Sequence, residues 1–441
     1  MSELPNSWLT CTLGDVINYG STQKAEPSEI PDDAWILELE DVEKDTSKIL
    51  QRLTFKHRQS KSTKSRFEAG DILYGKLRPY LNKVVRADQG GYCTTEIIPI
   101  KSSEMIEGSY LFHWFKTPTF IDYVTSVSHG LNMPRLGTDA GKQAPFVLAP
   151  LTEQKRIADK LDAVLARVTA CRDRLERIPA ILKRFRQSVL AAATSGNLTA
   201  DWRTENNITG SWVESTLLDL TTKITDGEHI TPKRSSSGKF LLSARNIQNG
   251  SIALGNVDYV DDLEFDRIRR RCDPKIGDVL LSCSGSVGRV AMVDQDNCYV
   301  MVRSAAMIRP RKELLHTTYL MYCLQSPNLQ AQIEEKSKAT AQANIFLGAI
   351  KGLVLPLPKL LEQTEIVRRV ESLFAHADHL EASYAAARTQ VEKLTPSTLA
   401  KAFRGELVPQ DPNDEPASQL LARIKASRPD KGSKRTSEKV R

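Results

Sequence analysis

The stretch "TEQKRIADKLDAVLARV" (residues 152–168) returns 209 residues later as "LEQTEIVRRVESLFAHA" (residues 361–377), with Glu-Gln at the same place in both. In both segments apolar residues recur at alternating spacings of four and three. Such spacing is typical of a coiled-coil seam. The predicted seam residues are Ile157, Leu161, Val164, Val168 and Leu175 in the first helix and Ile366, Val370, Leu373, Leu380 and Tyr384 in the second.

The rest of the chain repeats in the same way. "SWLTCTLGDVI" (residues 7–17) returns as "SWVESTLLDLT" (211–221), and "RQSVLAAATSGNLT" (186–199) returns as "TPSTLAKAFRGELV" (395–408). A period of more than 200 residues is too long for a solenoid repeat. The chain is therefore an internal duplication, which suggests pseudo-two-fold symmetry.

Each copy has a globular part followed by a helical part. Short Val/Ile/Leu runs between Gly, Asn and Pro predict strands in the globular parts, so the fold class is α+β, with two duplicated α/β domains separated by two long antiparallel coiled-coil helices. An alternative is that each helix packs on its own globular domain. Pro179 should interrupt the first helix and Pro396 should start a new one. The predicted parts are residues 1–150, 151–210, 211–357, 358–410 and a basic, disordered tail, 411–441.

Composition and motifs exclude several classes of protein. The first ten residues lack the apolar core of a signal peptide, and no window is apolar enough for a membrane span. Seven scattered cysteines without a Cys-x-x-Cys pair suit a reducing cytoplasm and argue against structural zinc. There is no P-loop, no Asn/Asp-Pro-Pro-Phe/Tyr motif of a base-amino methyltransferase, no common nuclease metal site and no Gly-x-Ser-x-Gly elbow. We expect no catalytic residues, no metal and no bound cofactor, which favours a binding protein.

The net charge of +7 permits nucleic-acid binding without proving it. Basic loops with Asn and His lie at equivalent places in the two globular parts, and such side chains contact phosphates and base edges. The domains share a framework and differ in these loops, as expected if each copy reads something different. The candidate DNA-binding residues are Lys56, Arg58, Lys76, Arg78, Asn82, Lys83, Asn132 and Arg135 in the first copy, and His229, Lys233, Arg245, Asn246, Arg289 and Asn344 in the second.

Helix length adds a geometric expectation. The predicted helices would be roughly 40–50 Å long, a little more than one turn of B-DNA at about 34 Å. Two domains held at that spacing could meet the same face of one duplex. The DNA target would then consist of two different half-sites, and the bases between them would not be recognised.

The segments "PLTEQKRIADKLDAVLARV", "ILKRFRQSVL", "EQTEIVRRVESLFAHAD" and "LAKAFRGEL", in this order around two variable domains, resemble the specificity subunit of type I restriction–modification systems. The resemblance covers the whole architecture and is most specific in the helical regions. It implies that residues 1–150 and 211–357 are target-recognition domains. The helices would space these domains and dock two modification subunits.

The resemblance also implies a cytoplasmic hetero-oligomer without a membrane partner. In that family the modification subunits use S-adenosylmethionine, and the restriction subunits use ATP and Mg²⁺. The segments "HGLNMPRLG" (residues 129–137) and "AQANIFLG" (341–348) match a family segment near the DNA, which gives Asn132 and Asn344 their place among the candidates. Two alternatives stay open: a stand-alone DNA methyltransferase or nuclease with divergent motifs, and a coiled-coil adaptor between proteins.

Overall fold

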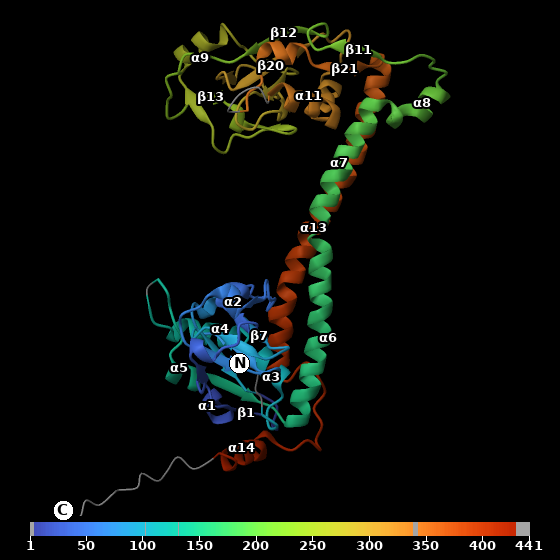
Figure 1. Ribbon diagram of the computed structural model, residues 1–441. Coiled ribbons are helices and arrows are strands. Elements are labelled where there is room, and N and C mark those ends of the chain that lie inside the picture. Colours follow the sequence, from blue (N-terminus) through green and yellow to red (C-terminus); the bar gives the residue numbers. More distant parts are fainter. Residues whose placement is uncertain (1–3, 102, 131, 338–342, 429–441) are drawn as a thin grey trace, which may run out of the picture. The chain divides into compact units, whose positions relative to one another are not determined.

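The computed structural model of the chain describes residues 4–101, 103–130, 132–337 and 343–428. The chain folds into two compact units (Figure 1). The first unit consists of Met1–Leu175 and Ala387–Arg441, and the second of Glu176–Ala386. The first unit is therefore built from both ends of the chain, whereas the second is one continuous segment.

The first unit combines three small sheets with helices. Its strands are β1 (Leu9–Thr12), β2 (Gln23–Ala25), β3 (Trp35–Leu37), β4 (Leu53–Thr54), β5 (Lys64–Phe67), β6 (Ile72–Gly75), β7 (Val84–Arg86), β8 (Gly91–Cys93), β9 (Ile97–Ile100) and β10 (Pro145–Leu148). They form sheets of order β2-β5-β8-β3-β4 and β7-β6-β9, and the pair β1-β10. Its helices are α1 (Leu13–Val16), α2 (Phe55–Arg58), α3 (Gly108–Trp114), α4 (Pro118–Val127), α5 (Thr138–Lys142), α6 (Leu151–Leu175) and α14 (Ala417–Ala426).

The second unit repeats this arrangement. Its strands are β11 (Val213–Thr216), β12 (Thr221–Asp226), β13 (Lys239–Leu242), β14 (Ile247–Gln248), β15 (Ser251–Ile252), β16 (Asp258–Val260), β17 (Val279–Ser282), β18 (Val290–Met292), β19 (Tyr299–Met301), β20 (Ala305–Pro310) and β21 (Val354–Leu357). Its helices are α7 (Ile178–Ser195), α8 (Ala200–Glu205), α9 (Asp262–Arg269), α10 (Thr317–Gln325), α11 (Pro327–Ser337) and α12 (Leu347–Lys351). One further helix, α13 (Leu360–Ala402), contributes to both units.

Strand pairing confirms the predicted duplication. β11 pairs antiparallel with β21 as β1 does with β10. The parallel pair β13-β19 repeats the pair β3-β8, and the antiparallel pair β17-β20 repeats β6-β9. Among the described residues, no helix is long and apolar enough to cross a membrane.

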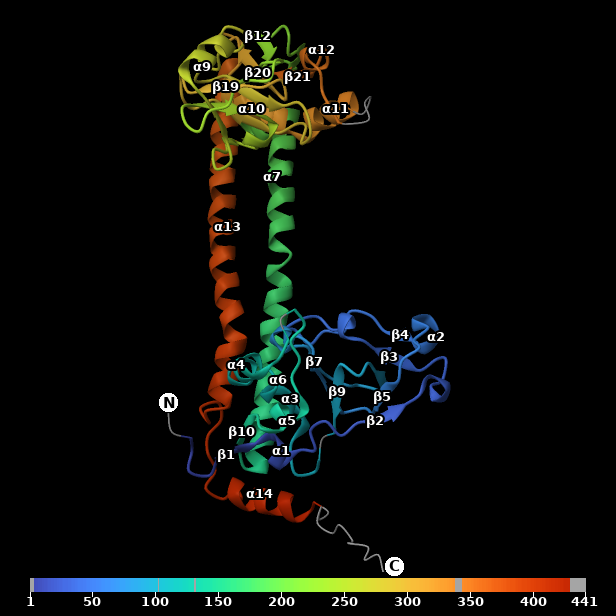
Figure 2. The ribbon, with the colours of Figure 1, turned by 90° about the vertical axis from the view of Figure 1, so that its left-hand side faces the viewer.

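The long helices pair antiparallel inside each unit. In the second unit, Arg186 of α7 contacts Asp378 of α13 at 2.6 Å. Arg369, which precedes Asp378 by nine residues in α13, contacts Asp201 beyond the end of α7. In the first unit, Leu161 of α6 shares a core with Leu399 near the end of α13. Both views show each pair side by side (Figures 1 and 2). Each helix also packs on its own globular domain, so the two alternatives from the sequence hold together.

Burial along the predicted seam is uneven. Ile157, Leu161, Ile366 and Val370 are fully buried and Val168 is nearly so, whereas Val164, Leu175, Leu373 and Tyr384 are half-buried. Leu380 is 43% exposed, which differs from a buried seam position. The apolar core of the second unit reaches only to Leu373 and Phe374 along α13. Beyond it, Ala377 is still fully buried, whereas Leu380 is exposed and Tyr384 is half-buried.

The two prolines behave differently. α6 ends at Leu175, and Pro179 lies in the first turn of α7, where its missing N–H costs no helical hydrogen bond. The prediction of a new helix at Pro396 is wrong, because Pro396 lies inside α13. One lost hydrogen bond is outweighed there by packing, since Leu399 and Ala402, just beyond the proline, are 1% and 0% exposed.

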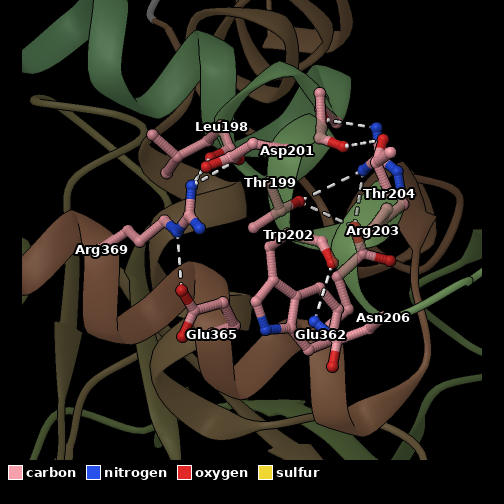
Figure 3. A network of polar contacts seen from close by, with 12 residues as sticks. Leu198, Thr199, Asp201, Trp202, Arg203, Thr204, Asn206, Glu362, Glu365 and Arg369 are labelled. Carbon is pink, nitrogen blue, oxygen red and sulfur yellow. Dashed lines mark hydrogen bonds and ion pairs between the residues drawn. The ribbon is translucent and has the colours of Figure 1, made fainter.

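The repeated Glu-Gln pair anchors each long helix to its own domain. Glu362 is 2% exposed and accepts hydrogen bonds from Thr199 Oγ1 (2.7 Å) and Arg203 Nη1 (2.6 Å), part of the network that Figure 3 shows, and from Trp212 Nε1 (3.0 Å). Gln363 Oε1 accepts the backbone N–H of His316 at 2.7 Å. Buried polar groups persist when they are hydrogen-bonded in this way.

The first unit repeats the anchor. Glu153 accepts hydrogen bonds from Trp8 Nε1 (2.8 Å) and Gln410 Nε2 (2.5 Å), and Gln154 Oε1 accepts the N–H of Glu107 at 3.0 Å. Burial raises the pKa of Glu153, although the hydrogen bonds from Trp8 and Gln410 counteract this. The motif that opens each helix thus holds a helix to a globular domain in both copies.

The segment after residue 410 is partly helical. The prediction of a disordered tail is wrong for residues 417–426, because α14 buries Ala417, Leu420 and Ile424 in the core of the first unit. An ion pair between Arg156 and Asp414 at 2.6 Å holds the preceding loop. Residues 429–441 of the predicted tail lie outside the described residues.

Lys116 gives a pH test of the first unit. Its Nζ donates to Ser47 Oγ at 2.8 Å, and burial lowers its pKa from 10.5 to about 8. Below about pH 8 both folded and unfolded chains carry the charge; between about pH 8 and 10.5 only the unfolded chain keeps the proton, so stability rises with pH. We expect the wild type to gain stability relative to Lys116→Met across this window, measured by urea unfolding. An unchanged difference between the two proteins from pH 7 to pH 10.5 would contradict the lowered pKa.

Candidate nucleic-acid interface

In the first unit, two loops are joined by backbone hydrogen bonds. The loop that follows β6 meets the segment that leads into α5. Leu136 N donates to Lys76 O at 3.0 Å, and Arg78 N donates to Pro134 O at 2.7 Å. We call these two joined loops, residues 76–78 and 132–136, the first frame. The frame brings four predicted residues together: Lys76, Arg78, Asn132 and Arg135.

The side chains of this frame are accessible to a ligand. Arg78, Asn132 and Arg135 are exposed, and Lys76 is half-buried. Arg78 has a φ of 49°, in the left-handed region, and its Nη2 donates to Asn132 O at 3.4 Å. A non-glycine residue held in that region indicates local strain, and such strain concentrates at binding sites.

The second unit builds the same frame from different side chains. Ile345 N donates to Cys283 O at 2.9 Å, which repeats the bond from Leu136 to Lys76. The bridge between Ser284 and Asn344 likewise repeats the bridge between Leu77 and Arg135. Asn344 therefore occupies the position of Arg135.

A pocket of about 520 Å³ opens at the frame of the second unit. It collects three predicted residues, His229, Arg245 and Asn344, and also Arg303, which the sequence did not suggest. Arg303 is exposed and lies in the turn between β19 and β20, and it has no carboxylate partner among the described residues. It is the kind of unpaired guanidinium that a phosphate or a base edge can bind.

The other cations of this pocket are partly neutralised. Asp226 contacts His229 at 2.7 Å and Arg271 at 2.6 Å. Burial alone would raise the pKa of Asp226, but the hydrogen bonds from Arg271 and His229 outweigh it and lower the pKa. Asp258, which pairs with both Arg234 and Arg245, has its pKa lowered against burial in the same way. Both carboxylates therefore stay ionised and orient the cations around them.

Several predicted residues hold the fold instead. Arg58 has a side chain only 8% exposed and pairs with Glu38, Glu40 and Asp41. Asn246 is 1% exposed and uses its side-chain amide on Ala253 O and Asn256 O, and Lys83 Nζ donates to Leu39 O. Asn82 is 7% exposed. Residue type alone could not separate these buried groups from exposed ones.

The remaining predicted residues lie outside the two frames. Lys56 is exposed on α2, and Lys233 is exposed with its backbone N–H bonded to Glu264. Arg289 is half-buried before β18, and its backbone N–H donates to Ser282 Oγ at 2.8 Å. Contact of these three residues with DNA stays a prediction, because they belong to neither frame.

The sequence also did not predict the exposed apolar side chains at the two frames. Phe346 follows Ile345 and is 64% exposed, and Tyr80 and Met133 beside the first frame are 47% and 46% exposed. Large apolar side chains that remain in water beside a polar surface are typical of contact surfaces. Within the described ranges no group of three or more His, Cys, Asp or Glu residues could hold a metal ion.

Comparison with known proteins identifies the family. The family model of the type I restriction modification DNA specificity domain matches residues 5–180 and again residues 209–384. The EcoBI specificity subunit of Escherichia coli, a type I restriction enzyme subunit, is 34% identical over 355 residues, which cover 74% of this chain and 74% of that protein. The EcoKI specificity subunit of Escherichia coli K12 is 32% identical over 365 residues, covering 79% of this chain and 77% of that protein.

Solved structures share the fold. A chain from a structure of complex assembly and conformational transition of the type I R-M system has a TM-score of 0.71 at 21% identity and covers 92% of this chain and 100% of that chain. The HsdS subunit from Thermoanaerobacter tengcongensis has a TM-score of 0.59 at 21% identity, with 92% and 98% covered. The double match of the family model coincides with the two copies of the frame, and the chain belongs to the family of type I restriction modification DNA specificity domains.

Proposed function

We propose that the chain is the non-catalytic DNA-recognition subunit of a type I restriction–modification complex, in which each unit reads one half of a split, asymmetric DNA sequence. One observation carries the proposal. Two equivalent loop frames, fixed by the same backbone hydrogen bonds, present different polar side chains in the two units. Side chains that contact base edges determine which DNA sequence a protein recognises. Different side chains on equivalent frames therefore imply that the two units recognise different half-sites.

The proposal includes partners and their cofactors. Two modification subunits would transfer methyl groups from S-adenosylmethionine, and restriction subunits would use ATP and Mg²⁺. This chain itself would bind none of these cofactors. Such a complex works where the chromosomal DNA is, which places the chain in the cytoplasm. The relatives named above, all specificity subunits, support this division of labour.

A domain exchange tests the proposal. We expect that replacing residues 1–150 with the matching segment of a relative of different specificity changes one half of the methylated sequence and leaves the other half intact. Methylation-sensitive sequencing of DNA from cells carrying the complete system measures this. The matched control replaces residues 211–357 and should change the opposite half.

Two results would contradict the proposal. One is a methylated sequence that stays the same in both exchanges. The other is methylation or cleavage of DNA by the purified chain alone with S-adenosylmethionine and Mg²⁺, because a recognition subunit requires its partners for chemistry.

A further inference from the structure

Arg135 in the first frame is held by a carboxylate. Its Nε donates to Glu96 Oε1 at 3.2 Å and to Oε2 at 3.1 Å. The side chains of Arg135 and Glu96 are 47% and 27% exposed, so a ligand can reach the guanidinium. With Nε engaged by Glu96, and with Nη1 also donating to Met133 O at 3.5 Å, the remaining N–H groups of the two terminal nitrogens form the fork that is left for a bidentate contact.

The backbone of Arg135 is fixed as well. Its N–H donates to His129 O at 3.0 Å, and its carbonyl accepts from His129 N at 3.2 Å. The next residue, Leu136, is bonded to Lys76 O. Both ends of the Arg135 side chain are thus positioned before any ligand arrives, which lowers the entropy lost on binding.

The second unit shows that this ion pair is not needed to build the frame. Gly75 pairs with Ile97 as Ser282 pairs with Ala305, so Ser304 takes the place of Glu96. Asn344 takes the place of Arg135. The same backbone frame therefore forms with Ser304 and Asn344, without the ion pair. The Glu96–Arg135 pair accordingly serves something that differs between the two units.

We infer that Arg135 reads a guanine in the DNA half-site of the first unit, and that Glu96 is a positioning residue that aims it. The inference rests on the proposed function and names the base class that one residue recognises. A guanidinium fork matches the O6 and N7 acceptors of guanine in the major groove, the commonest specific contact between proteins and DNA. Asn344, with an amide at the equivalent position, would not make this forked contact.

The first experiment maps methylated sites in cells that carry the complete system. The variants are Arg135→Lys, Arg135→Ala and Glu96→Gln, with Arg52→Gln as the matched control. Arg52 is an arginine of the same unit that pairs with a carboxylate, Asp88 at 2.6 Å, and it takes part in none of the frame's backbone hydrogen bonds. We expect Arg135→Ala to lose the preference for G at one position of one half-site. Arg135→Lys should keep a weaker preference, because lysine also donates to guanine O6 and N7, and Arg52→Gln should keep the wild-type sequence.

The second experiment measures binding directly, so that a variant without methylation still gives an answer. Purified complex is titrated with duplexes in which each guanine of that half-site is replaced in turn by 7-deazaguanine, which lacks the N7 acceptor. We expect one such replacement to weaken wild-type binding roughly 10- to 100-fold. The same replacement should leave the affinity of Arg135→Ala nearly unchanged.

The positioning role of Glu96 has its own readout. Glu96→Gln should reduce discrimination at the same base position by about 10-fold or less, while general affinity for DNA is kept. In the double variant Glu96→Gln with Arg135→Ala, the loss should be no greater than in Arg135→Ala alone, because the two residues act through one contact.

Three outcomes would overturn the inference. One is a wild-type G preference that persists in Arg135→Ala. Another is an equal loss of affinity for every duplex, which would make Arg135 a phosphate anchor. The third is wild-type binding insensitive to every 7-deazaguanine. A wild-type chain that yields no bipartite methylated sequence at all would instead defeat the proposed function itself.

Discussion

Glu362→Ala is expected to lower the free energy of unfolding of the second unit by about 3–5 kcal/mol. The variant removes the acceptor shared by Thr199, Arg203 and Trp212 at the start of α13, where the Glu362 side chain is 3% exposed. The Arg203 guanidinium, 22% exposed, and the hydroxyl of Thr199, which is fully buried, would be left without this partner. Hydrogen–deuterium exchange in rising urea, read from peptides within residues 176–386, measures the loss.

Two further variants sharpen this result. Glu362→Gln keeps an acceptor of the same shape and should lose less stability than Glu362→Ala. Glu381→Ala is the matched control, because Glu381 pairs with Arg186 while its side chain is 64% exposed, and exposed ion pairs contribute about 0–1 kcal/mol. An equal loss in the free energy of unfolding for Glu362→Ala and Glu381→Ala would show that the Glu-Gln anchor does not hold the helix to the domain.

Leu420→Ala is expected to destabilise the first unit by about 2–5 kcal/mol. Leu420 is 0% exposed, and the α14 helix that carries it buries Ala417 and Ile424 in the same core. Truncating a fully buried leucine removes its contacts and leaves a cavity. Amide exchange of peptides from residues 4–148 should speed up, although these residues lie far from α14 in sequence.

The neighbouring residue provides the control for this prediction. Gln419 is exposed on the same helix, so Gln419→Ala should leave amide exchange unchanged. If Leu420→Ala exchanges like Gln419→Ala throughout the first unit, α14 is not part of that unit's core.

Most of the fold could be predicted from the sequence, because the patterns that indicate it are local or occur twice. Seam spacing indicated the long helices, and the repeat indicated two copies of one domain. Pro396 misled because packing of Leu399 and Ala402 overrides its local preference. α14 was missed because the basic composition at the end of the chain hid a short amphipathic helix.

The candidate site could be predicted only in part from the sequence, because contacts between segments that are distant in the sequence determine which residues are exposed and which lie together. The partners of the Glu-Gln motif lie far away, such as Trp8 for Glu153 and Trp212 for Glu362. Arg58 and Arg135 look alike in sequence, yet one is buried among three carboxylates and the other is exposed on a loop frame. The equivalence of Arg135 with Asn344 rests on backbone bridges between segments that are distant in the sequence, and such contacts cannot be recognised in the sequence alone.

The first unit is assembled from the two ends of the chain, and this sets an order of folding during synthesis. Domains fold as units while the chain leaves the ribosome. The second unit, Glu176–Ala386, is complete before the last part of the first unit has been made. The first unit can close its core only after Leu399, Phe403 and Leu420 have emerged. We therefore expect the first unit to complete its core only after the second unit has folded.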